Sequence, residues 1–258
     1  MDKELSMNVS AVMIVKNGAR TIRGSLESLS DFDDVIVYDN GSDDGTQAIA
    51  SEFVNVRLIE GYFDGFGTTK NRAASFAKHE WILSIDSDEE VDNTLSNTLK
   101  IGLFDPNTVY FVNSLAYYKD IPIRHCGWND QKIRRFYCKT CTSFNENFVH
   151  ERIIDEGMNM GSLAGSLKHY SYMSISDFIV KVDRYSTLFA EDNVGKKFPS
   201  PAKAFFNGLY SFFRTYVLKR GFLDGYAGLI ISFSHMATNF YKYIKLYEMN
   251  LEQKSKRG

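Results

Sequence analysis

The sequence is poor in cysteine, which excludes a fold that depends on disulfide bonds. Only three cysteines occur in 258 residues, Cys126, Cys138 and Cys141, and an odd number without a secretory signal predicts reduced thiols in the cytosol. Cys138 and Cys141 form a CxxC pair downstream of His125 and Cys126, but zinc sites usually show two complete ligand pairs. Because the spacing here is irregular, ordinary packing of small side chains is favoured over zinc.

The chain also lacks a long uncharged apolar run and a strong net charge. The first residues, MDKELSMNVS, carry acids and no long apolar core, so we expect no signal peptide. Residues 225–241 contain no Asp, Glu, Lys or Arg, but this segment is short and polar for a membrane span. With 30 basic and 32 acidic residues the net charge is −2, which argues against a nucleic-acid binder.

The charges are unevenly distributed along the chain. Residues 1–195 hold 19 Lys and Arg against 29 Asp and Glu, a net charge of −10. Residues 196–258 hold 11 against 3, a net charge of +8. A chain divided in this way is expected to have two surfaces with different partners. Its length and its 44% hydrophobic content allow one domain, or one and a half, with a substantial core.

The first hundred residues predict alternating strands and helices. Four apolar runs are short enough to be buried strands: residues 9–15, 33–39, 56–60 and 81–86. Three segments between them have helical spacing or helix-capping residues: 19–30, 46–53 and 67–79. Such alternation predicts an α/β fold with a mostly parallel sheet and helices on both faces. Ligands bind such sheets at the carboxyl ends of the strands, where three polar stretches lie: Lys16–Asn17, Asp39–Asp44 and Asp86–Asp88.

The fourth run ends in DSDEE, residues 86–90. Carboxylates this close repel one another, so they cost stability unless a positive group lies among them. On an extended strand end Asp86 and Asp88 point to one side and Ser87 to the other. Two converging carboxylates suit Mg²⁺ or Mn²⁺, with substrate phosphates as further ligands. The alternative is a helix N-terminus with Glu89 and Glu90 in its first turn.

The stretch DNGSDDGT, residues 39–46, lacks the glycine spacing of a dinucleotide fingerprint and of a P-loop. Chemistry on NAD or on the γ-phosphate of ATP is therefore not indicated. Asp39, at a strand end before a flexible turn, is suited to accept hydrogen bonds from a ribose or a base. On the local sequence alone, a capped turn is the alternative.

The order of four segments, AVMIVKNGARTI, VIVYDNGSDDGT, GTTKNRA and ILSIDSDE, resembles the large inverting family 2 of nucleotide-sugar glycosyltransferases, which have the GT-A fold. Later segments are more discriminating: RHCGWNDQKIRRF, FVHERI, LKHYSY, DRYSTLFAED and RGFLDGYAGL. Together they resemble the bacterial lipopolysaccharide-core β-1,4-glucosyltransferases, over about residues 9–249. We expect a GT-A catalytic domain over residues 1–172 and an α-helical region over residues 173–258.

The resemblance implies roles for individual residues. Those expected at the uridine and the rest of the nucleotide are Lys16, Asn17, Asp39, Gly41, Ser42, Lys70 and Asn71. Asp86 and Asp88 would form the metal-binding DxD element, with Asp88 nearer the metal and Asp86 nearer ribose or sugar hydroxyls. The loop Cys126–Trp128 would lie under the sugar.

Asp130 stands where the family places its catalytic carboxylate. Related sequences usually have Gly in place of Cys126 and Tyr-Pro-Asp in place of Trp-Asn-Asp, so Glu151 is the alternative base. One positioned carboxylate suffices to take the proton of the acceptor hydroxyl. The leaving diphosphate needs a divalent metal and a cationic or imidazole partner. His150, on an expected strand, is the first choice for that ligand and His169 the second, with a structural histidine as the alternative.

The C-terminal third differs in character. Ser174 and Asp177 predict a capped helix, and Pro201 begins a second helix rich in aromatic residues and basic at its end. Aromatic, basic, amphipathic helices are commonly interfacial. We therefore expect a cytoplasmic protein held peripherally on the anionic surface of the inner membrane. A helical cap packed on the catalytic domain is the alternative.

These observations predict a metal-dependent hexosyltransferase, with Mg²⁺ or Mn²⁺ as cofactor. Its expected donor is a UDP-sugar, UDP-glucose, and its acceptor is a heptose of a lipid-linked core oligosaccharide. One alternative is the same chemistry on a capsule, another glycan or a protein. A second alternative is a nucleotide-sugar-binding protein without turnover.

Overall fold

The computed structural model describes residues 7–128, 131–148 and 150–255, which divide into two compact units. The sheet unit contains the described residues of 1–115 and 130–169, and the helical unit those of 116–129 and 170–258. The chain passes from one unit to the other at residues 115–116 and 169–170, each time within a strand. No feature of the sequence indicates that residues 116–128 belong with the helices. The expected domain boundary between residues 172 and 173 stays a prediction.

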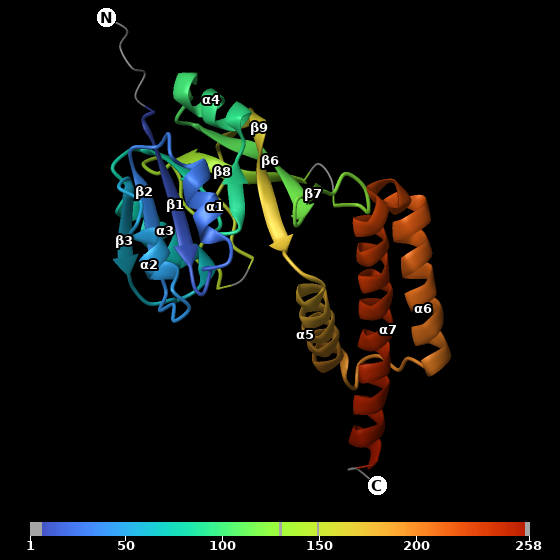
Figure 1. Ribbon diagram of the computed structural model, residues 1–258. Coiled ribbons are helices and arrows are strands. Elements are labelled where there is room, and N and C mark those ends of the chain that lie inside the picture. The colour runs from blue at the N-terminus through green and yellow to red at the C-terminus, as the bar shows by residue number, and fades with distance from the viewer. Residues whose placement is uncertain (1–6, 129–130, 149, 256–258) are drawn as a thin grey trace, which may run out of the picture. The chain divides into compact units, whose positions relative to one another are not determined.

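A mixed sheet forms the centre of the sheet unit (Figure 1), with strand order β3-β2-β1-β4-β8-β6-β9-β5 and β7 paired with β6. The strands are β1 (Val9–Val15), β2 (Val35–Asp39), β3 (Val56–Glu60), β4 (Trp81–Ser84), β5 (Glu89–Val91), β6 (Thr108–Tyr118), β7 (Ile121–Pro122), β8 (Gln131–Cys138) and β9 (Asn159–Tyr172). The first four are parallel, as the alternating pattern predicts. β8 is antiparallel to β4 and β6, so only half of the sheet is parallel.

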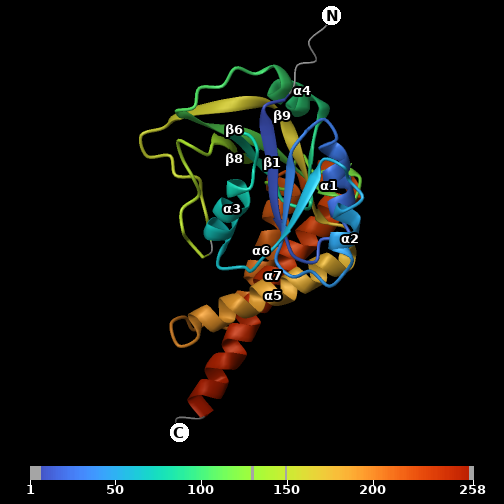
Figure 2. The same ribbon diagram turned by 90° about the vertical axis from the view of Figure 1, so that its left-hand side faces the viewer.

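Helices cover both faces of the parallel half (Figure 2). Alternate side chains of β1 point to opposite faces: Ala11 and Met13 enter one hydrophobic core and Val12 the other. The first core includes apolar residues of α1 (Ile22–Ser28), α2 (Thr46–Ala50) and α4 (Asn93–Ile101). The second includes those of α3 (Phe66–Ser75). The expected α/β fold class with helices on both faces is thus confirmed.

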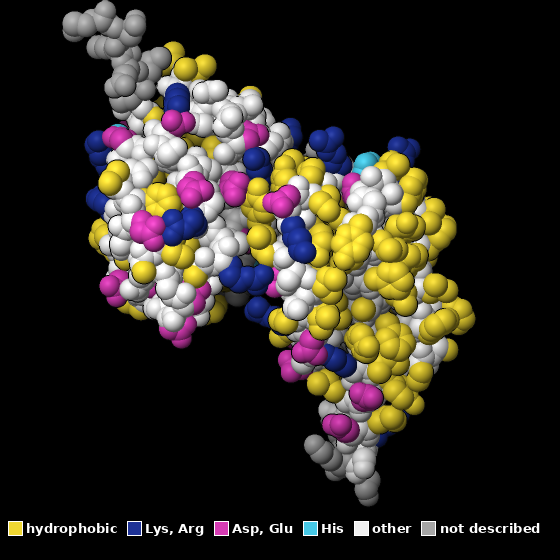
Figure 3. All heavy atoms as spheres, in the orientation of Figure 1, with side chains coloured by type: hydrophobic (Ala, Val, Ile, Leu, Met, Phe, Trp, Pro, Cys, Tyr) yellow, Lys and Arg dark blue, Asp and Glu magenta, His cyan; other side chains and the backbone are white. Residues whose placement is uncertain are grey.

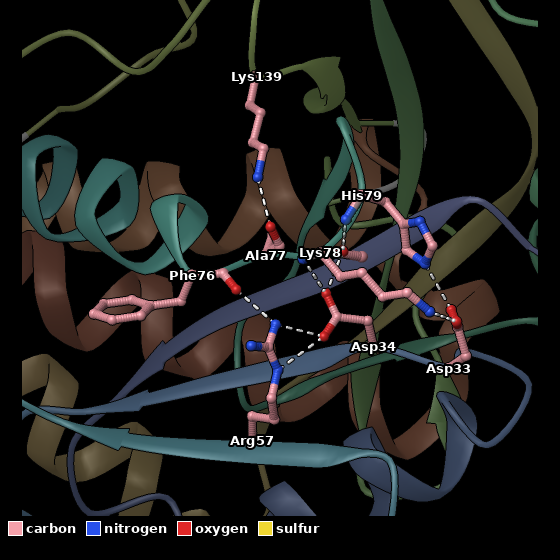
Figure 4. Close-up of polar contacts among 9 residues, drawn as sticks. Asp33, Asp34, Arg57, Phe76, Ala77, Lys78, His79 and Lys139 are labelled. Atoms are coloured by element: carbon pink, nitrogen blue, oxygen red, sulfur yellow. Dashed lines mark hydrogen bonds and ion pairs between the residues drawn. The ribbon is translucent and has the colours of Figure 1, made fainter.

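A polar network joins the amino ends of the strands (Figure 4). Asp34, just before β2, is buried and accepts hydrogen bonds from the Ser10 hydroxyl of β1 and the Lys78 backbone N–H. Arg57 of β3 donates twice to Asp34 Oδ1, at 3.0 and 2.7 Å, and once to the Phe76 carbonyl. The network lies at the end of the sheet opposite the polar stretches. We therefore assign it a role in stabilising the fold rather than in binding a ligand.

The helical unit contains α5 (Ile175–Asn193), α6 (Pro201–Phe213), a π-helical turn η1 (Arg214–Leu218), a 3₁₀ turn η2 (Gly221–Asp224) and α7 (Gly225–Ser255). α7 packs against both α5 and α6. Ser174 and Asp177 form the predicted capping box of α5, and Ser200 caps α6 ahead of Pro201. Across the described residues, no helix is both long enough and apolar enough to span a membrane.

One alternative and one expectation about local structure are wrong. Glu89 and Glu90 do not begin a helix: they lie in β5, where Glu89 pairs with His169 of β9, and α4 starts after Asp92, whose side chain caps the Leu95 N–H. His150 does not lie on a strand. It occupies a bend with a left-handed φ of 63°, a backbone conformation that a strand cannot contain.

Candidate active site

The loops after β1 and β2 are held together by hydrogen bonds at the carboxyl ends of these strands. The Asn17 N–H donates to Ser42 Oγ at 2.8 Å, and the Asp43 N–H donates to Asn17 Oδ1 at 2.9 Å. The Gly18 and Ala19 N–H groups donate to side chains of the same turn. Parallel neighbouring strands bring their carboxyl ends to one edge, so the predicted juxtaposition of these two stretches is observed.

Asp39 is buried at the end of β2. Its Oδ1 accepts hydrogen bonds from the N–H groups of Gly41 and Ser42, at 2.9 and 2.8 Å, and from the Gln47 amide at 2.9 Å. Burial alone would raise the pKa of Asp39, but these hydrogen bonds outweigh it and hold the pKa below its ordinary value. Its Oδ2 is buried and accepts no hydrogen bond from the described residues, so one acceptor oxygen of this carboxylate is unsatisfied.

The acidic turn after β4 lies against the first of these loops. A Cβ built on Gly18 would lie 2.8 Å from Val15 Cγ2 and 3.0 Å from Ser87 Oγ, closer than side chains normally approach. Gly18 thus lets the turn pack closely against the loop. All three polar stretches therefore lie together at this edge of the sheet.

Arg135 of β8 lies between the partly exposed carboxylate of Asp86 and the buried carboxylate of Glu89. Its guanidinium contacts Asp86 Oδ2 at 2.5 Å and Glu89 Oε1 at 3.0 Å, and Asp86 N–H donates to Glu89 Oε2 at 2.9 Å. Burial opposes ionisation of Asp86, but Arg135 and Lys70 lower its pKa well below the usual range. Burial and the neighbouring Asp86 raise the pKa of Glu89. The positive group that the acidic cluster requires is thus an arginine of the chain itself.

A break in strand register accompanies the placement of Arg135. β8 pairs Phe136 with Tyr110 of β6 but Arg134 with Phe111, so Arg135 is an extra residue between two successive pairs. Such a bulge re-aims a side chain that regular alternation would direct elsewhere. Arg134 and Arg135 therefore both reach the same cavity, although they are adjacent in the sequence.

Lys70 of α3 connects the acidic turn to Glu151. The lysine is only 6% exposed, and its Nζ lies 2.8 Å from Glu151 Oε1 and 3.4 Å from Asp86 Oδ1. A buried ammonium needs such partners. The structure thus brings together three residues that sequence analysis placed at the site, although they lie far apart in the chain.

Asp88 faces His169 of β9, with 3.3 Å between Asp88 Oδ2 and His169 Nε2. Burial would lower the pKa of His169, but Asp88, Glu89 and Asp86 outweigh it and raise the pKa. Among the described residues, no three His, Cys, Asp or Glu side chains gather to hold a metal by themselves. A carboxylate and an imidazole nevertheless fit Mg²⁺ or Mn²⁺ when substrate phosphates supply further ligands.

A cavity of about 470 Å³ lies in the sheet unit next to these residues. Its charged lining consists of Lys70, Lys132, Arg134, Arg135, Arg152 and Glu151. Three of the five cations, Arg134, Arg135 and Arg152, also pair with carboxylates outside the lining. The cavity thus offers cations that a bound anion can share. The volume is within the range of small-molecule sites, and the site therefore has room and charge for a phosphorylated ligand.

The other predicted residues occupy different environments. Lys16 is exposed directly after β1, and His150 is also exposed. Asn71 uses its amide to bind the backbone of Phe144, through both N–H and carbonyl, at 2.8 Å each. Trp128 belongs to the helical unit, where it stacks on Tyr172. Asp130, the first choice for the base, lies outside the described residues.

Sequence analysis missed the role of Arg135 and the burial of Glu89. The run KIRRFYC offers a partial hint about Arg135: adjacent side chains of a regular strand point to opposite faces, so in a sheet covered on both faces one arginine has to point inward. Paired with an unbalanced acidic turn, the inward arginine was a candidate counter-charge. The bulge that redirects it depends on strand pairing and has no local sequence signal.

The cysteines and His125 are divided between the two units. Cys138 and Cys141 lie in the sheet unit, whereas His125 and Cys126 lie in the helical unit. His125 Nδ1 lies 2.8 Å from Asp224 Oδ1. Burial raises the pKa of Cys126 to about 12, which disfavours the thiolate that zinc would need.

Comparison with known proteins agrees with this geometry. Residues 10–153 match the family model of glycosyl transferase family 2. The chain belongs to this family. An uncharacterized glycosyltransferase of Rickettsia felis is 30% identical to this family 2 glycosyltransferase, over 96% of this chain and 92% of the relative. The lipopolysaccharide core biosynthesis glycosyltransferase LpsC of Rhizobium meliloti is 27% identical, over 93% and 92%. The expected family is confirmed.

Among solved structures, S. aureus TarS 1-349 in complex with UDP-GlcNAc is similar with a TM-score of 0.47 and 12% identity, over 96% of this chain and 92% of that chain.

Proposed function

We propose that this family 2 glycosyltransferase transfers a hexose, glucose from UDP-glucose, onto a heptose of the lipopolysaccharide or lipooligosaccharide inner core. The observation that carries the donor half is the buried, unpartnered Oδ2 of Asp39 at the carboxyl end of β2. An oriented carboxylate oxygen accepts a hydrogen bond from an N–H of uracil or from a ribose hydroxyl. Leaving such an oxygen without a donor costs free energy, so a nucleoside that supplies the donor gains affinity.

The acceptor half of the proposal rests on similarity. The later segments of the sequence resemble lipopolysaccharide-core glucosyltransferases, and LpsC, named for core biosynthesis, aligns over nearly the whole chain. We therefore assign a lipid-linked core oligosaccharide as acceptor.

The charges around the cavity suit a nucleoside diphosphate. Lys70 is buried and Arg135 is 13% exposed beside the acidic turn, and Asp88 with His169 would hold Mg²⁺ or Mn²⁺. When bound, the metal neutralises charge on the leaving diphosphate. For the metal or diphosphate ligand, sequence analysis placed His150 first and His169 second. Because His169 lies beside Asp88, we assign this role to His169. Asp86, engaged by Arg135 and Lys70, is held in position to accept from ribose or sugar hydroxyls.

One carboxylate must take the proton of the acceptor hydroxyl as that hydroxyl attacks the anomeric carbon. We assign this role to Asp130. Glu151 is bound by the Lys70 ammonium at 2.8 Å, which suits it to fix Lys70 and makes it the second candidate. Asp130→Asn should retain UDP-glucose binding while kcat falls by about 10²–10⁴. If Asp130→Asn turns over normally and Glu151→Gln does not, Glu151 is the base.

The proposal is tested by turnover with a panel of nucleotide sugars and truncated core acceptors. We expect UDP release to require a heptose-containing acceptor and to be fastest with UDP-glucose. Release that depends instead on a capsular or protein acceptor would establish the same chemistry on another substrate. UDP-sugar binding without release for any acceptor would establish a binding protein.

The helical unit supports association with a membrane surface. Hydrophobic side chains gather over α6 and α7 (Figure 3). We call the following exposed residues the apolar surface: Phe205, Phe206, Leu209, Tyr210, Phe213, Val217, Leu218, Phe222, Leu223, Tyr226, Leu229 and Phe233. A set this large exceeds the scattered apolar residues of ordinary surfaces.

We commit to a lipid bilayer with anionic headgroups as the partner of the apolar surface, because exposed aromatic residues occur here with the excess of basic residues in 196–258. The enzyme would then reach its lipid-linked acceptor as a peripheral protein on the cytoplasmic face of the inner membrane.

A further inference from the structure

A second cavity of about 470 Å³ lies wholly within the helical unit. Its lining comes from α5, from the end of α6 with η1, from α7 and from Trp128 and Tyr172. It shares no residue with the cavity of the sheet unit. Neither the family match, which ends at residue 153, nor the site described above gives it a role.

One wall of this cavity is aromatic and flat. Trp128 stacks on Tyr172 with ring centroids 5.4 Å apart and an interplanar angle of 21°. Tyr172 in turn stacks on Phe178 at 3.9 Å and 12°. Because each ring is held by the next, the wall is preorganised. The C–H groups on the face of a pyranose ring pack well on such a surface.

The cavity is also lined by positively charged side chains. Lys181, Arg214 and Lys219 line the cavity, and its lining contains no Asp or Glu. Lys181 Nζ lies over the Tyr172 ring, 4.0 Å from its centroid. Within the described part of the chain, neither Arg214 nor Lys219 forms an ion pair with a carboxylate. Burial, with Lys219 and Arg214, lowers the pKa of His235, as expected in a positive environment.

Neutral hydrogen-bonding groups complete the lining and are held in place. Thr215 Oγ1 and His235 Nδ1 lie 3.0 Å apart. The Asn239 amide donates to Ser211 Oγ and to the His235 carbonyl, each at 2.9 Å. Hydroxyl, amide and imidazole groups around an aromatic wall are the polar partners that sugar hydroxyls require.

Backbone conformation also favours the position of Lys219. The Cys126 N–H donates to the Lys219 carbonyl at 3.1 Å, and Gly127 follows with φ of 78°. A Cβ on Gly127 would lie 2.2 Å from Lys219 Nζ, so a larger residue there would displace the end of the lysine side chain. The ammonium group thus depends on a glycine in the loop that also carries Trp128.

We propose that this cavity binds an anionic saccharide, a sugar that carries a phosphate or a carboxylate, as part of the acceptor. The ring lies on Trp128, the anionic group pairs with Arg214 and Lys219, and hydroxyls meet the polar groups around His235. The proposal rests on the proposed function, since it names the chemistry of an acceptor that a glycosyltransferase would recognise away from the transferred sugar.

Binding to the cavity can be measured on the full chain through its two tryptophans, Trp81 and Trp128. The indole N–H signals of the ¹⁵N-labelled protein, assigned with Trp128→Phe, are followed during titration with glucose 6-phosphate, glucuronate, glucose and inorganic phosphate. We expect the Trp128 signal to shift with glucose 6-phosphate, glucuronate or both, which distinguishes a phosphate from a carboxylate ligand. Equal saturation by glucose, or by phosphate alone, would overturn the proposal.

Charge variants test the same site. Lys219→Gln and Arg214→Gln should each raise the Kd of the anionic sugar about tenfold, equal to about 1.4 kcal/mol. Gly127→Ala should act in the same direction by displacing the Lys219 side chain. Lys203→Gln, the same charge change on α6 outside the cavity lining, is the matched control. Unchanged Kd values in both Lys219→Gln and Arg214→Gln would contradict the assignment.

The outcome is separable from that of the proposed reaction. Anionic-sugar binding is read without turnover, so failure of transfer to a core heptose would leave the titration intact. Conversely, loss of the titration signal would leave UDP binding unaffected. With an active acceptor, Lys219→Gln should raise the acceptor KM with little change in kcat, and removal of the acceptor's anionic groups should abolish that difference.

Discussion

Arg135 places a positive charge beside the neighbouring carboxylates of Asp86 and Glu89. It contacts Asp86 and Glu89 at hydrogen-bond distance, and Glu89 is almost fully buried. Removing the cation leaves the buried acid without a partner, which costs more than the pair itself contributes. Removing one partner of a buried ion pair costs about 3–5 kcal/mol. Because the side chain of Asp86 is 36% exposed, we expect Arg135→Met to lower the free energy of unfolding by about 3 kcal/mol, the lower end of this range. Urea denaturation measures this loss.

Two further variants serve as controls for this result. Glu89→Gln in the Arg135→Met background removes the uncompensated charge and should restore part of the stability. Arg134→Met removes a cation from the same strand whose partner is Asp155, and its effect should be smaller. A loss below about 0.5 kcal/mol for Arg135→Met, the range of neutral surface substitutions, would contradict the role given to Arg135.

Asp88 differs from Asp86 in having its carboxylate free of lysine and arginine partners among the described residues. Because its ion-pair partner is His169, at 3.3 Å, a divalent cation can displace this contact to bind. Asp88→Asn should abolish the increase in UDP affinity that Mn²⁺ produces while leaving thermal unfolding nearly unchanged. Calorimetric titration of UDP with Mn²⁺ and with EDTA measures this. Metal-stimulated binding that persists in Asp88→Asn would refute the metal assignment.

At the scale of elements, Asp34 connects β1, β2, β3 and the segment after α3 (Figure 4). Burial would raise its pKa, but hydrogen bonds from Ser10, Lys78 and Arg57 outweigh this and lower it below 3.8. The unfolded chain therefore binds the proton at higher pH than the folded chain. The stabilisation is complete above about pH 4 and is lost as the pH falls through the lower, folded-state pKa.

Asp34→Asn should accordingly lower the free energy of unfolding by about 1–3 kcal/mol near neutral pH, and the difference from the unsubstituted chain should shrink as the pH falls below about 4. Urea titrations at several pH values measure both. Asp33→Asn, a neighbour with a half-exposed side chain, is the control. A difference that grows toward acid pH would mean that the sign of the shift is wrong.

The parallel elements could be predicted from the sequence because their signals are local. The runs that become β1, β2, β3 and β4 are continuous, apolar and bounded by turns, and the capping box of α5 is explicit in Ser174 and Asp177. The antiparallel strands β6, β8 and β9 were not predicted. Their sequences mix apolar and polar residues, and pairing between distant segments, such as Trp81 with Cys138, decides where they lie.

The same distinction applies to the site. Asp39, Asp86 and Asp88 follow predicted strands, so their position at one edge followed from topology. Lys70 and Glu151, 81 positions apart, were assigned by resemblance alone, and the structure adds that they touch. Arg135 depends on a bulge between β6 and β8, and the contact of His169 with Asp88 depends on the pairing of β9 with β5. Neither arrangement has a local signal.

At the scale of the whole molecule, the basic, aromatic C-terminal region should bind vesicles. We expect flotation with anionic vesicles at low salt and release as salt screens the charges. Phe205→Ser with Phe206→Ser, at exposed positions of the apolar surface, should weaken flotation without changing turnover of a soluble acceptor fragment. Absence of flotation at low salt, or sedimentation as a dimer that the same substitutions dissociate, would show that lipid does not cover this surface.

The central claim is that the chain transfers glucose from UDP-glucose to a core heptose. Nuclear magnetic resonance of the anomeric protons tests it most directly, in a mixture of the full chain, UDP-glucose, Mg²⁺ and a purified core acceptor that ends in heptose. We expect UDP to appear together with a new β-linked glucosyl signal, and neither to appear with Asp39→Ala, which removes the buried acceptor oxygen. Consumption of UDP-glucose with a retained α linkage, or no product while UDP-glucose remains bound, would contradict it.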